Sequence, residues 1–124
     1  MDRFKLTIGI LFFTALSFSQ NSANDFQGNW LTSEMENTTI NIFLAKDGFW
    51  YGKIIKSDTK ENIGKMLLNK MKFDKMKNVL EGKLIRPNNG MVVNATISLD
   101  GDKKLKMVGK KLFITKTVHW TKVD

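Results

Sequence analysis

The sequence predicts an all-β protein: a small antiparallel up-and-down β-barrel of about eight strands, preceded by a signal peptide. Three observations support this prediction. Short segments alternate between apolar and polar residues, and turn signals separate them at hairpin spacing. No long crossover or repeat interrupts the series, which favours a meander barrel. Without its leader, the 124-residue chain is long enough for one domain and too short for two.

The N-terminus has the three parts of a secretory signal peptide. Arg3 and Lys5 form a basic start, and residues 6–16 are mostly apolar. Ser17 and Ser19 are the small residues that a signal peptidase reads. The apolar run is too short for a transmembrane anchor, and a buried core helix would leave the basic start unexplained.

We therefore expect cleavage near Ser19/Gln20, with residues 1–19 as the signal peptide and residues 20–124 as a single β-barrel domain. The mature chain is expected to contain no transmembrane segment. Its expected location is periplasmic or secreted.

Eight segments are expected to be strands: residues 30–32, 39–44, 49–55, 66–73, 79–86, 91–99, 105–108 and 112–123. The second is typical of a half-buried strand because Ile40, Ile42 and Leu44 share one face. Asp47-Gly48 then supplies the chemistry of a tight hairpin turn, and the third segment returns as the partner strand. A polar loop over 57–64 follows.

The segment 66–79 fits either a helix or a strand. Its apolar residues suit both periodicities, and Lys and Met are good helix formers. The run is short and lacks a helix cap, so we favour a strand over 66–73, a turn over 75–78 and the next strand from Val79.

The second half of the chain alternates most clearly. A turn at 87–90 precedes a strand whose inward side chains are expected to be Met91, Val93, Ala95, Ile97 and Leu99. The alternate residues of that strand, Val92, Asn94, Thr96 and Ser98, are expected to point outward. A turn at 100–102 leads to the last two strands. In the final one, Leu112, Ile114, Val118 and Trp120 share a face with Lys116.

Composition excludes several kinds of chemistry. The chain has no cysteine and one histidine, so one copy cannot supply a zinc site of nitrogen and sulfur ligands. The acidic residues do not pair as catalytic carboxylates, and His119 has no partner nucleophile in the sequence. We therefore predict neither an enzyme nor a bound cofactor or metal.

Lysines concentrate at the C-terminus. Residues 103–122 contain seven lysines and no acidic residue, within a chain of net charge +8. The candidate basic face consists of Lys103, Lys104, Lys106, Lys110 and Lys111. It would attract an anionic envelope component, or it would simply keep outward positions solvated. Eighteen lysines against two arginines argue against nucleic acid as a partner.

Gly28-Asn29-Trp30 resembles the Gly-x-Trp signature of lipocalin and calycin barrels. In that group the indole closes the barrel floor and a cationic residue of the last strand packs over it. The resemblance implies a structural closure made by Gly28, Trp30, Trp120 and Lys122, with Lys116 as a second candidate for the cation.

A larger part of the chain, from Phe26 to Val123, resembles the secreted bacterial family called domain of unknown function 2147. The matching segments are residues 26–31, 47–54, 82–90, 105–109 and 120–123. The chain departs from the family pattern at three places. Ile85-Arg86-Pro87 stands where Tyr-Asp-Pro is usual, Lys110-Lys111 replaces an aromatic and a glycine, and Trp120-Thr121-Lys122 replaces Trp-x-Arg. The resemblance implies a divergent member with a lipocalin-like barrel after a signal peptide.

Two functions remain open because an eight-stranded barrel is either filled by side chains or hollow enough for one small ligand. The first is binding of a small hydrophobic or amphiphilic molecule, with candidate ligand-binding residues Trp50, Tyr51, Val93, Ala95 and Ile97. The tryptophans also suit a packed core, although one aromatic of 49–51 must face outward. The second is a filled-barrel envelope interaction domain that applies its basic C-terminal face to anionic surfaces.

Overall fold

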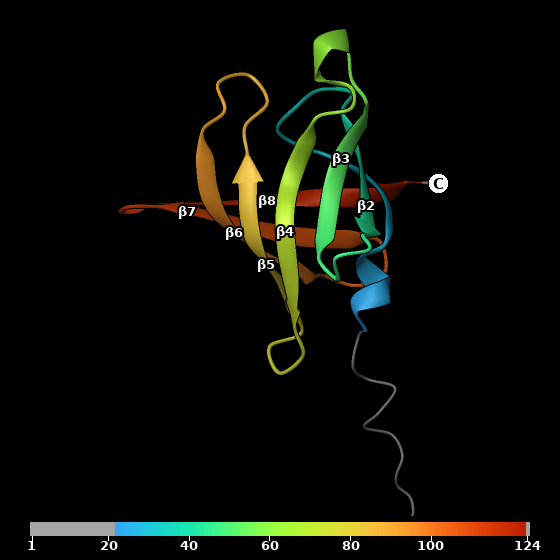
Figure 1. The fold of residues 1–124 in the computed structure, drawn as a ribbon, viewed down its shortest axis with the longest axis vertical. Helices are drawn as coiled ribbons and strands as arrows, with labels where there is room; N and C mark the ends of the chain where they lie inside the picture. Colours follow the sequence, from blue (N-terminus) through green and yellow to red (C-terminus); the bar gives the residue numbers. More distant parts are fainter. Residues whose placement is uncertain (1–21, 124) are drawn as a thin grey trace, which may run out of the picture.

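The computed structural model describes residues 22–123, which form a closed antiparallel barrel in which each strand pairs with the next (Figure 1). Pairing of the last strand with the first closes the barrel. The strands are β1 (Gly28–Leu31), β2 (Thr39–Leu44), β3 (Trp50–Lys56), β4 (Met66–Asp74), β5 (Val79–Ile85), β6 (Val92–Leu99), β7 (Lys104–Lys111) and β8 (Ile114–Val123). The predicted all-β barrel is confirmed.

Two short 3₁₀ helices complete the described chain. η1 (Ala23–Phe26) precedes β1, and its Phe26 side chain is buried in the core. η2 (Lys60–Asn62) lies in the connection between β3 and β4. The predicted signal peptide, residues 1–19, lies outside the described residues. Within the described part, no helix is long and apolar enough to cross a bilayer.

The segment that fitted a helix or a strand is a strand. β4 runs from Met66 to Asp74 and pairs with β5. In the pairing of β4 with β3, Leu67 is the extra residue between the Gly52–Leu68 and Lys53–Met66 pairs, so that both Leu67 and Leu68 are buried. In the pairing with β5, a second bulge between Asn69 and Lys72 places Lys70 at a φ of 49°. Gly82 on β5 permits this bulge, because a Cβ there would lie 2.7 Å from the Lys70 carbonyl oxygen.

The two ends of the barrel differ. η1 and the connections at 45–49, 75–78 and 100–103 lie at one end, which we call the packed end. The connections at 32–38, 57–65, 86–91 and 112–113 lie at the other, the open end. The hydrophobic core fills the packed end with large side chains that are fully or almost fully buried: Phe26, Trp30, Ile42, Trp50, Leu80, Ile97, Leu105 and Trp120.

Three strand predictions need correction. The seventh strand was expected over 105–108, but β7 runs from Lys104 to Lys111. Leu44 was expected inside the barrel, but it ends β2 beyond the core and is 52% exposed. The final strand was expected to begin at Leu112. It begins at Ile114 instead, and Leu112-Phe113 forms the two-residue turn of the β7–β8 hairpin. Apolar residues at these turn positions are unusual, so periodicity alone extended the strand too far.

Candidate functional site

A cavity of about 1100 Å³ occupies the open end of the barrel. Residues from all four connections at that end line it, so its mouth is bounded by 32–38, 57–65, 86–91 and the β7–β8 hairpin. A cavity of this size is slightly larger than the usual range for small-molecule sites. The barrel is thus filled at one end and hollow at the other.

The inner part of the cavity is apolar. Its lining comes from strands on opposite sides of the barrel and from two methionines in the 32–38 and 86–91 connections. These residues are Met35, Leu67, Leu84, Met91, Val93, Met107 and Val118. Three of them are methionines, whose flexible thioether side chains adapt to ligands of different shapes. The wall therefore offers hydrophobic contact without a strongly defined shape.

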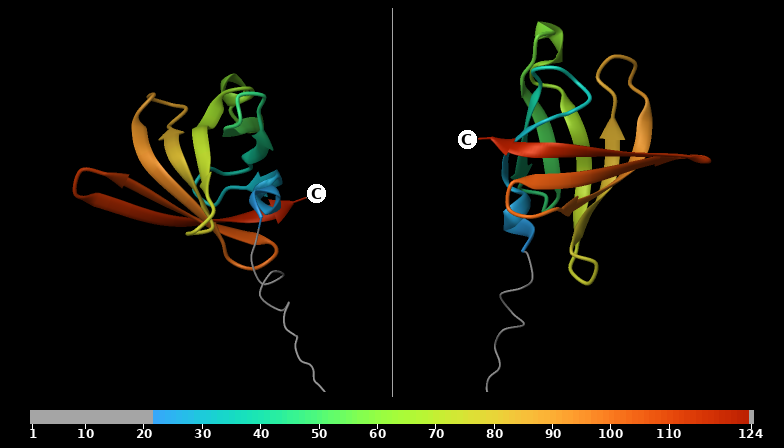
Figure 2. Two further views of the ribbon diagram at one scale, coloured as in Figure 1. Left: turned by 60° about the horizontal axis from the view of Figure 1, so that its bottom comes forward. Right: turned by 180° about the vertical axis from the view of Figure 1, so that it is seen from behind.

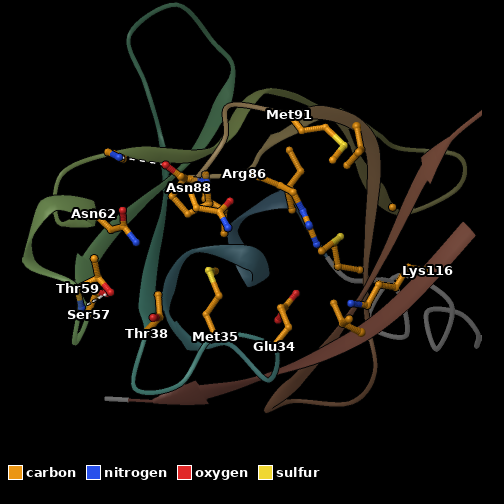
Figure 3. Close-up of a pocket in the computed structure, with 18 of the residues that line it drawn as sticks. Glu34, Met35, Thr38, Ser57, Thr59, Asn62, Arg86, Asn88, Met91 and Lys116 are labelled. Carbon is orange, nitrogen blue, oxygen red and sulfur yellow. Dashed lines mark hydrogen bonds between the residues drawn. The ribbon is translucent and has the colours of Figure 1, made fainter.

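The rim of the cavity carries charges of both signs. Glu34, Glu36, Asp58 and Glu61 come from the first two connections. Lys65, Arg86, Lys111 and Lys116 supply the positive charges. In Figure 3, Arg86 extends across the mouth from one side, and Glu34 and Met35 rise from the opposite side. Within residues 22–123 the ion pair that forms joins Lys77 to Glu81, away from the cavity, so Arg86 makes no direct ion pair with a carboxylate of these residues.

The 32–38 loop is held in place against the barrel. The buried Thr32 hydroxyl donates to the Met35 carbonyl at 2.8 Å and lies 3.2 Å from the Thr38 carbonyl. The Trp120 indole N–H donates to a Glu34 carboxylate oxygen at 2.9 Å. These contacts connect the cavity wall to the packed end through Trp120.

Neighbouring loops at the mouth are also joined. The Asn37 side-chain amide donates to Asp58 at 2.8 Å, linking the first connection to the second. The Lys65 ammonium donates to the Pro87 carbonyl at 3.0 Å, linking the second to the third. The mouth is therefore preformed along three of its four connections, whereas the β7–β8 hairpin stands apart from this network.

The residues of the resemblance-based closure meet at the packed end. Trp30 and Trp120 are both fully buried, and the Trp30 indole donates to the Phe26 carbonyl at 2.9 Å. The Lys122 ammonium lies 5.5 Å from the centre of the Trp30 ring. Gly28 has a φ of 132°, and a Cβ there would come within 3.0 Å of the Lys122 side chain. Glycine thus lets the lysine lie across the indole, while Lys116 lines the cavity instead.

The predicted ligand-binding residues fall in different places. Val93 lines the cavity. Ala95 and Ile97 are buried in the core and do not line it, since the strand passes from the hollow end to the packed end. Trp50 was the candidate for a solvent-facing aromatic, but it is only 3% exposed because it points inward with Gly52 and Ile54.

Tyr51 is the outward-facing aromatic of that strand. Its ring stacks on Phe43 with centroids 6.1 Å apart, and its hydroxyl donates to Asp47 at 2.5 Å. This hydrogen bond lowers the pKa of Asp47, helped by the Phe49 backbone N–H, and it raises the pKa of Tyr51. The pair stands on the outer surface near the packed end and does not line the cavity.

The candidate basic face is divided by strand alternation. Lys104, Lys106 and Lys110 share the outer face of β7. Lys103 precedes the strand, and Lys111 lines the cavity rim. All five lysines are exposed. His119 pairs with Lys106 on the same outer face.

Sequence reasoning missed several lining residues, notably Met35, Arg86, Met107 and Lys116. Met35 and Arg86 lie in connections, where strand periodicity gives no information about direction. The sequence feature that could have indicated Arg86 was Ile85-Arg86-Pro87, one of the departures from the family pattern. No group of three or more His, Cys, Asp or Glu residues gathers to hold a metal ion in the described part of the chain.

Comparison with known proteins places this barrel in a family. The model of the family described as "Uncharacterized protein conserved in bacteria (DUF2147)" matches residues 28–122. No curated protein matches the chain. Among solved structures, the chain is similar to protein HP1028 of Helicobacter pylori, which is described as belonging to the lipocalin family. The TM-score is 0.62 at 15% identity, and the alignment covers 79% of this chain and 82% of that one. At this identity the likeness shows the fold alone.

Proposed function

This chain belongs to the bacterial DUF2147 family, and we propose that it is a non-catalytic protein that binds one small amphiphilic molecule in its barrel cavity. The observation that carries the proposal is the cavity itself, which is apolar inside and charged at its rim. Ligand sites are typically concave and mostly apolar, with a few polar groups that fix orientation. The lipocalin-like fold supports the same reading.

The apolar floor is suited to a hydrocarbon chain. Val93, Met107 and Val118 come from three adjacent strands, and Leu67 and Leu84 face them from β4 and β5. Burying an acyl chain among these residues removes apolar surface from water, which is the main driving force for such binding. Because the methionine side chains adapt their shape, we propose that the cavity selects amphiphilic molecules without requiring one particular molecular shape.

The rim is suited to an anionic head group. Arg86 extends into the mouth and Lys116 enters it from β8, both next to the apolar floor (Figure 3). A guanidinium binds a carboxylate or phosphate through two parallel hydrogen bonds. A ligand with its tail inward would place its head group between these two cations. We therefore propose a single-chain anionic amphiphile, such as a fatty acid, as the ligand class.

We also propose that this binding takes place outside the cytoplasm. The support is the three-part pattern of residues 1–19, with a basic start, an apolar stretch and small residues before Gln20. The intact mass of the protein recovered from a periplasmic extract tests this proposal. Processing at Gln20 supports export, and an unprocessed chain contradicts it.

A matched pair of substitutions on β6 tests the cavity. Val93→Trp places an indole in the cavity, whereas Val92→Trp places it on the outer face of the same strand, where Val92 is 46% exposed. We expect the first variant to bind decanoate about tenfold or more weakly, because the added indole occupies the space that the decanoate chain needs. The second should bind like the unmodified protein. Titration calorimetry measures both affinities, and equal affinities would contradict the proposal.

A second pair tests the head-group site. Arg86→Gln should weaken decanoate binding by about tenfold to a hundredfold while leaving decanol binding unchanged, since only the acid carries charge. Lys53→Gln on the outward face of β3 is the control, and it should affect neither ligand. Equal losses for acid and alcohol would show that Arg86 does not recognise the head group.

A further inference from the structure

The tip of the β7–β8 hairpin carries the most exposed apolar cluster of the described chain. Leu112, Phe113 and Ile114 are 83%, 101% and 74% exposed. The hairpin extends beyond the neighbouring strands, as Figures 1 and 2 show. β6 pairs with β7 only as far as Lys110, and β1 pairs with β8 only over Thr121–Val123. The tip is therefore a two-stranded ribbon with apolar residues that nothing in the described structure covers.

Turn chemistry does not account for these residues. Two-residue hairpin turns favour Asn-Gly or similar pairs because one or both positions need positive φ. Here Leu112 occupies such a position at φ 55° and Phe113 follows it. A bulky residue in this conformation is strained, and strain of this kind clusters at functional positions of proteins. We therefore infer that the exposure of these apolar side chains serves a function.

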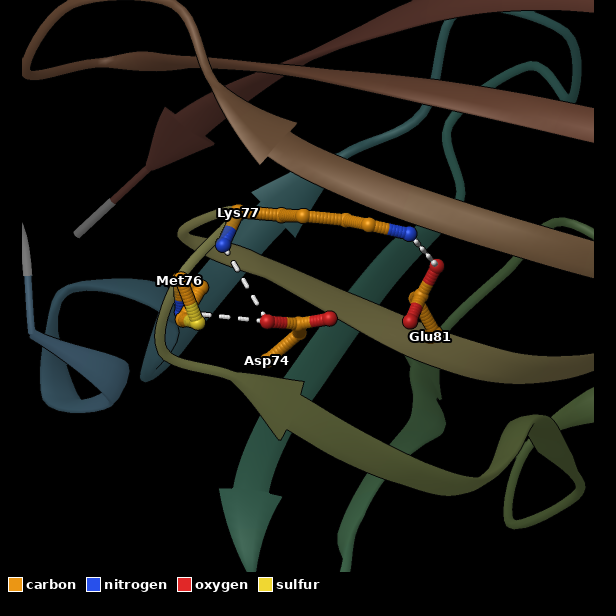
Figure 4. Close-up of polar contacts among 4 residues, drawn as sticks. All are labelled: Asp74, Met76, Lys77 and Glu81. Atoms are coloured by element: carbon orange, nitrogen blue, oxygen red, sulfur yellow. Dashed lines mark hydrogen bonds and ion pairs between the residues drawn. The ribbon is translucent and has the colours of Figure 1, made fainter.

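The β4–β5 turn at the opposite end shows the contrast (Figure 4). There one Asp74 carboxylate oxygen accepts the backbone N–H groups of Met76 and Lys77, and Asn78 takes the positive φ of 60°. That turn is built from residues that stabilise it. It still exposes one apolar side chain, Met76, at 97%, and this residue provides a matched control for the hairpin tip.

Positive charge surrounds the apolar tip. Lys110 projects from the outer face of the ribbon, whereas Lys111 and Lys116 project from the face that lines the cavity. No acidic residue occurs between 103 and 122. Apolar and aromatic residues ringed by lysine match an anionic bilayer, where the apolar groups enter the interface and the lysines meet the phosphates.

We propose that Leu112, Phe113 and Ile114 insert into the interfacial region of an anionic lipid bilayer, with Lys110, Lys111 and Lys116 on the lipid head groups. A second copy of this chain is a poorer occupant, because it would bring a like-charged hairpin to the same place. Leu112 and Ile114 also line the cavity mouth. Docking would therefore hold that mouth at the membrane surface, a consequence that rests on the proposed ligand binding.

Vesicle co-sedimentation of the purified protein tests the proposal. We expect binding to vesicles of phosphatidylcholine with phosphatidylglycerol, weak binding to phosphatidylcholine alone, and a steep loss of binding with added salt. Phe113→Ser should weaken binding to the anionic vesicles by about tenfold or more. Lys110→Gln should weaken it by roughly fivefold.

The controls come from the opposite turn. Met76→Ser and Lys75→Gln remove an apolar side chain and a lysine of similar exposure, and both variants should bind vesicles like the unmodified protein. Val93→Trp, which blocks the cavity, should also retain vesicle binding, so that failure of the ligand proposal is distinguishable from failure of this one. Unchanged thermal unfolding of Phe113→Ser verifies that its fold is intact.

Three results would overturn the proposal. The first is no preference for anionic vesicles. The second is equal loss in the Phe113→Ser and Met76→Ser variants, which would indicate diffuse attraction. The third is a concentration-dependent dimer in sedimentation velocity that Phe113→Ser abolishes, which would make the tip a contact between copies.

Discussion

The packed end and the open end of the barrel are made by the same strands, yet one is solid and the other hollow. Along β7 the inward side chain changes from the buried Leu105 to Gly109 at the cavity. Along β8 it changes from Trp120 to Val118 and then to Lys116. The number of strands fixes the barrel's width, so side-chain size decides which end has room for a ligand. The packed end supplies stability, and the open end can carry binding.

The largest expected effect on stability comes from removing a large buried side chain from the packed end. Trp30→Ala removes a fully buried indole together with its hydrogen bond to Phe26 and its contact with Lys122. We expect a loss of about 3–5 kcal/mol in the free energy of unfolding, measured by urea denaturation.

Met91→Ala at the cavity is the matched truncation and should cost about 1 kcal/mol or less, since Met91 is only half-buried. Similar losses in both variants would remove the energetic distinction between the two ends.

A pair of glycines tests the same distinction with a single methyl group. In Gly82→Ala the added Cβ would lie 2.6 Å from the Met71 sulfur and 2.7 Å from the Lys70 carbonyl oxygen, so the bulge must shift. We expect about 1–3 kcal/mol of destabilisation. In Gly109→Ala the nearest atom is 3.6 Å away on Val93, which is an ordinary contact.

Gly109→Ala should therefore change the stability by less than about 0.5 kcal/mol. Thermal unfolding compares the two variants, and a Gly109→Ala protein as unstable as Gly82→Ala would mean that the open end is tightly packed.

A substitution in the 32–38 loop should have a smaller effect, on both stability and ligand binding. Thr32→Val keeps the shape of the side chain but removes the hydroxyl that donates to Met35 and lies near Thr38. We expect a loss of about 1 kcal/mol in stability and weaker decanoate binding, because the loop forms one wall of the cavity. Ser33→Ala, at the exposed neighbouring position, serves as the control. Binding unaffected by Thr32→Val would show that this wall is not needed.

The Asp47–Tyr51 pair should give the smallest effect, since it lies on the outer surface. The folded-state pKa of Asp47 is below 3.8, so its contribution to stability is present above that pH and is lost as the pH falls. The folded-state pKa of Tyr51 is above 10.0, so its contribution is present below that pH and is lost at higher pH.

Tyr51→Phe should therefore raise the pKa of Asp47 towards 3.8 without changing decanoate binding. A side-chain carboxyl NMR titration measures the shift. An unmoved pKa would contradict the assigned cause, and altered binding would contradict the separation of this surface from the cavity.

Sequence patterns predicted the barrel well because alternation reports which face of a strand is apolar. They could not show where along each strand the cavity ends. Val93, Ala95 and Ile97 share one face and one pattern, yet only Val93 reaches the cavity. That boundary depends on the size of side chains from other strands. Trp50 illustrates the same limit, because it points inward in register with the buried Met71 of β4, a pairing that the sequence does not show.

Connections were the least predictable part of the site. Met35 and Arg86 reach the cavity through loop conformations that no periodicity encodes. Periodicity predicts strand at Leu112-Phe113, because two-residue turns usually contain residues such as Asn and Gly and not apolar ones. Such local contradictions are expected at functional positions.

The most direct test of a half-filled, ligand-binding barrel is methionine methyl NMR during titration with decanoate. Met35, Met91 and Met107 line the cavity, whereas Met71 is buried in the core and Met76 stands on the surface of the packed end. We predict saturable shifts for the first three methyl signals, little change for Met71 and Met76, and loss of the response in Val93→Trp but not in Val92→Trp. Unchanged cavity signals at saturating decanoate, or shifts confined to Met76, would contradict the account.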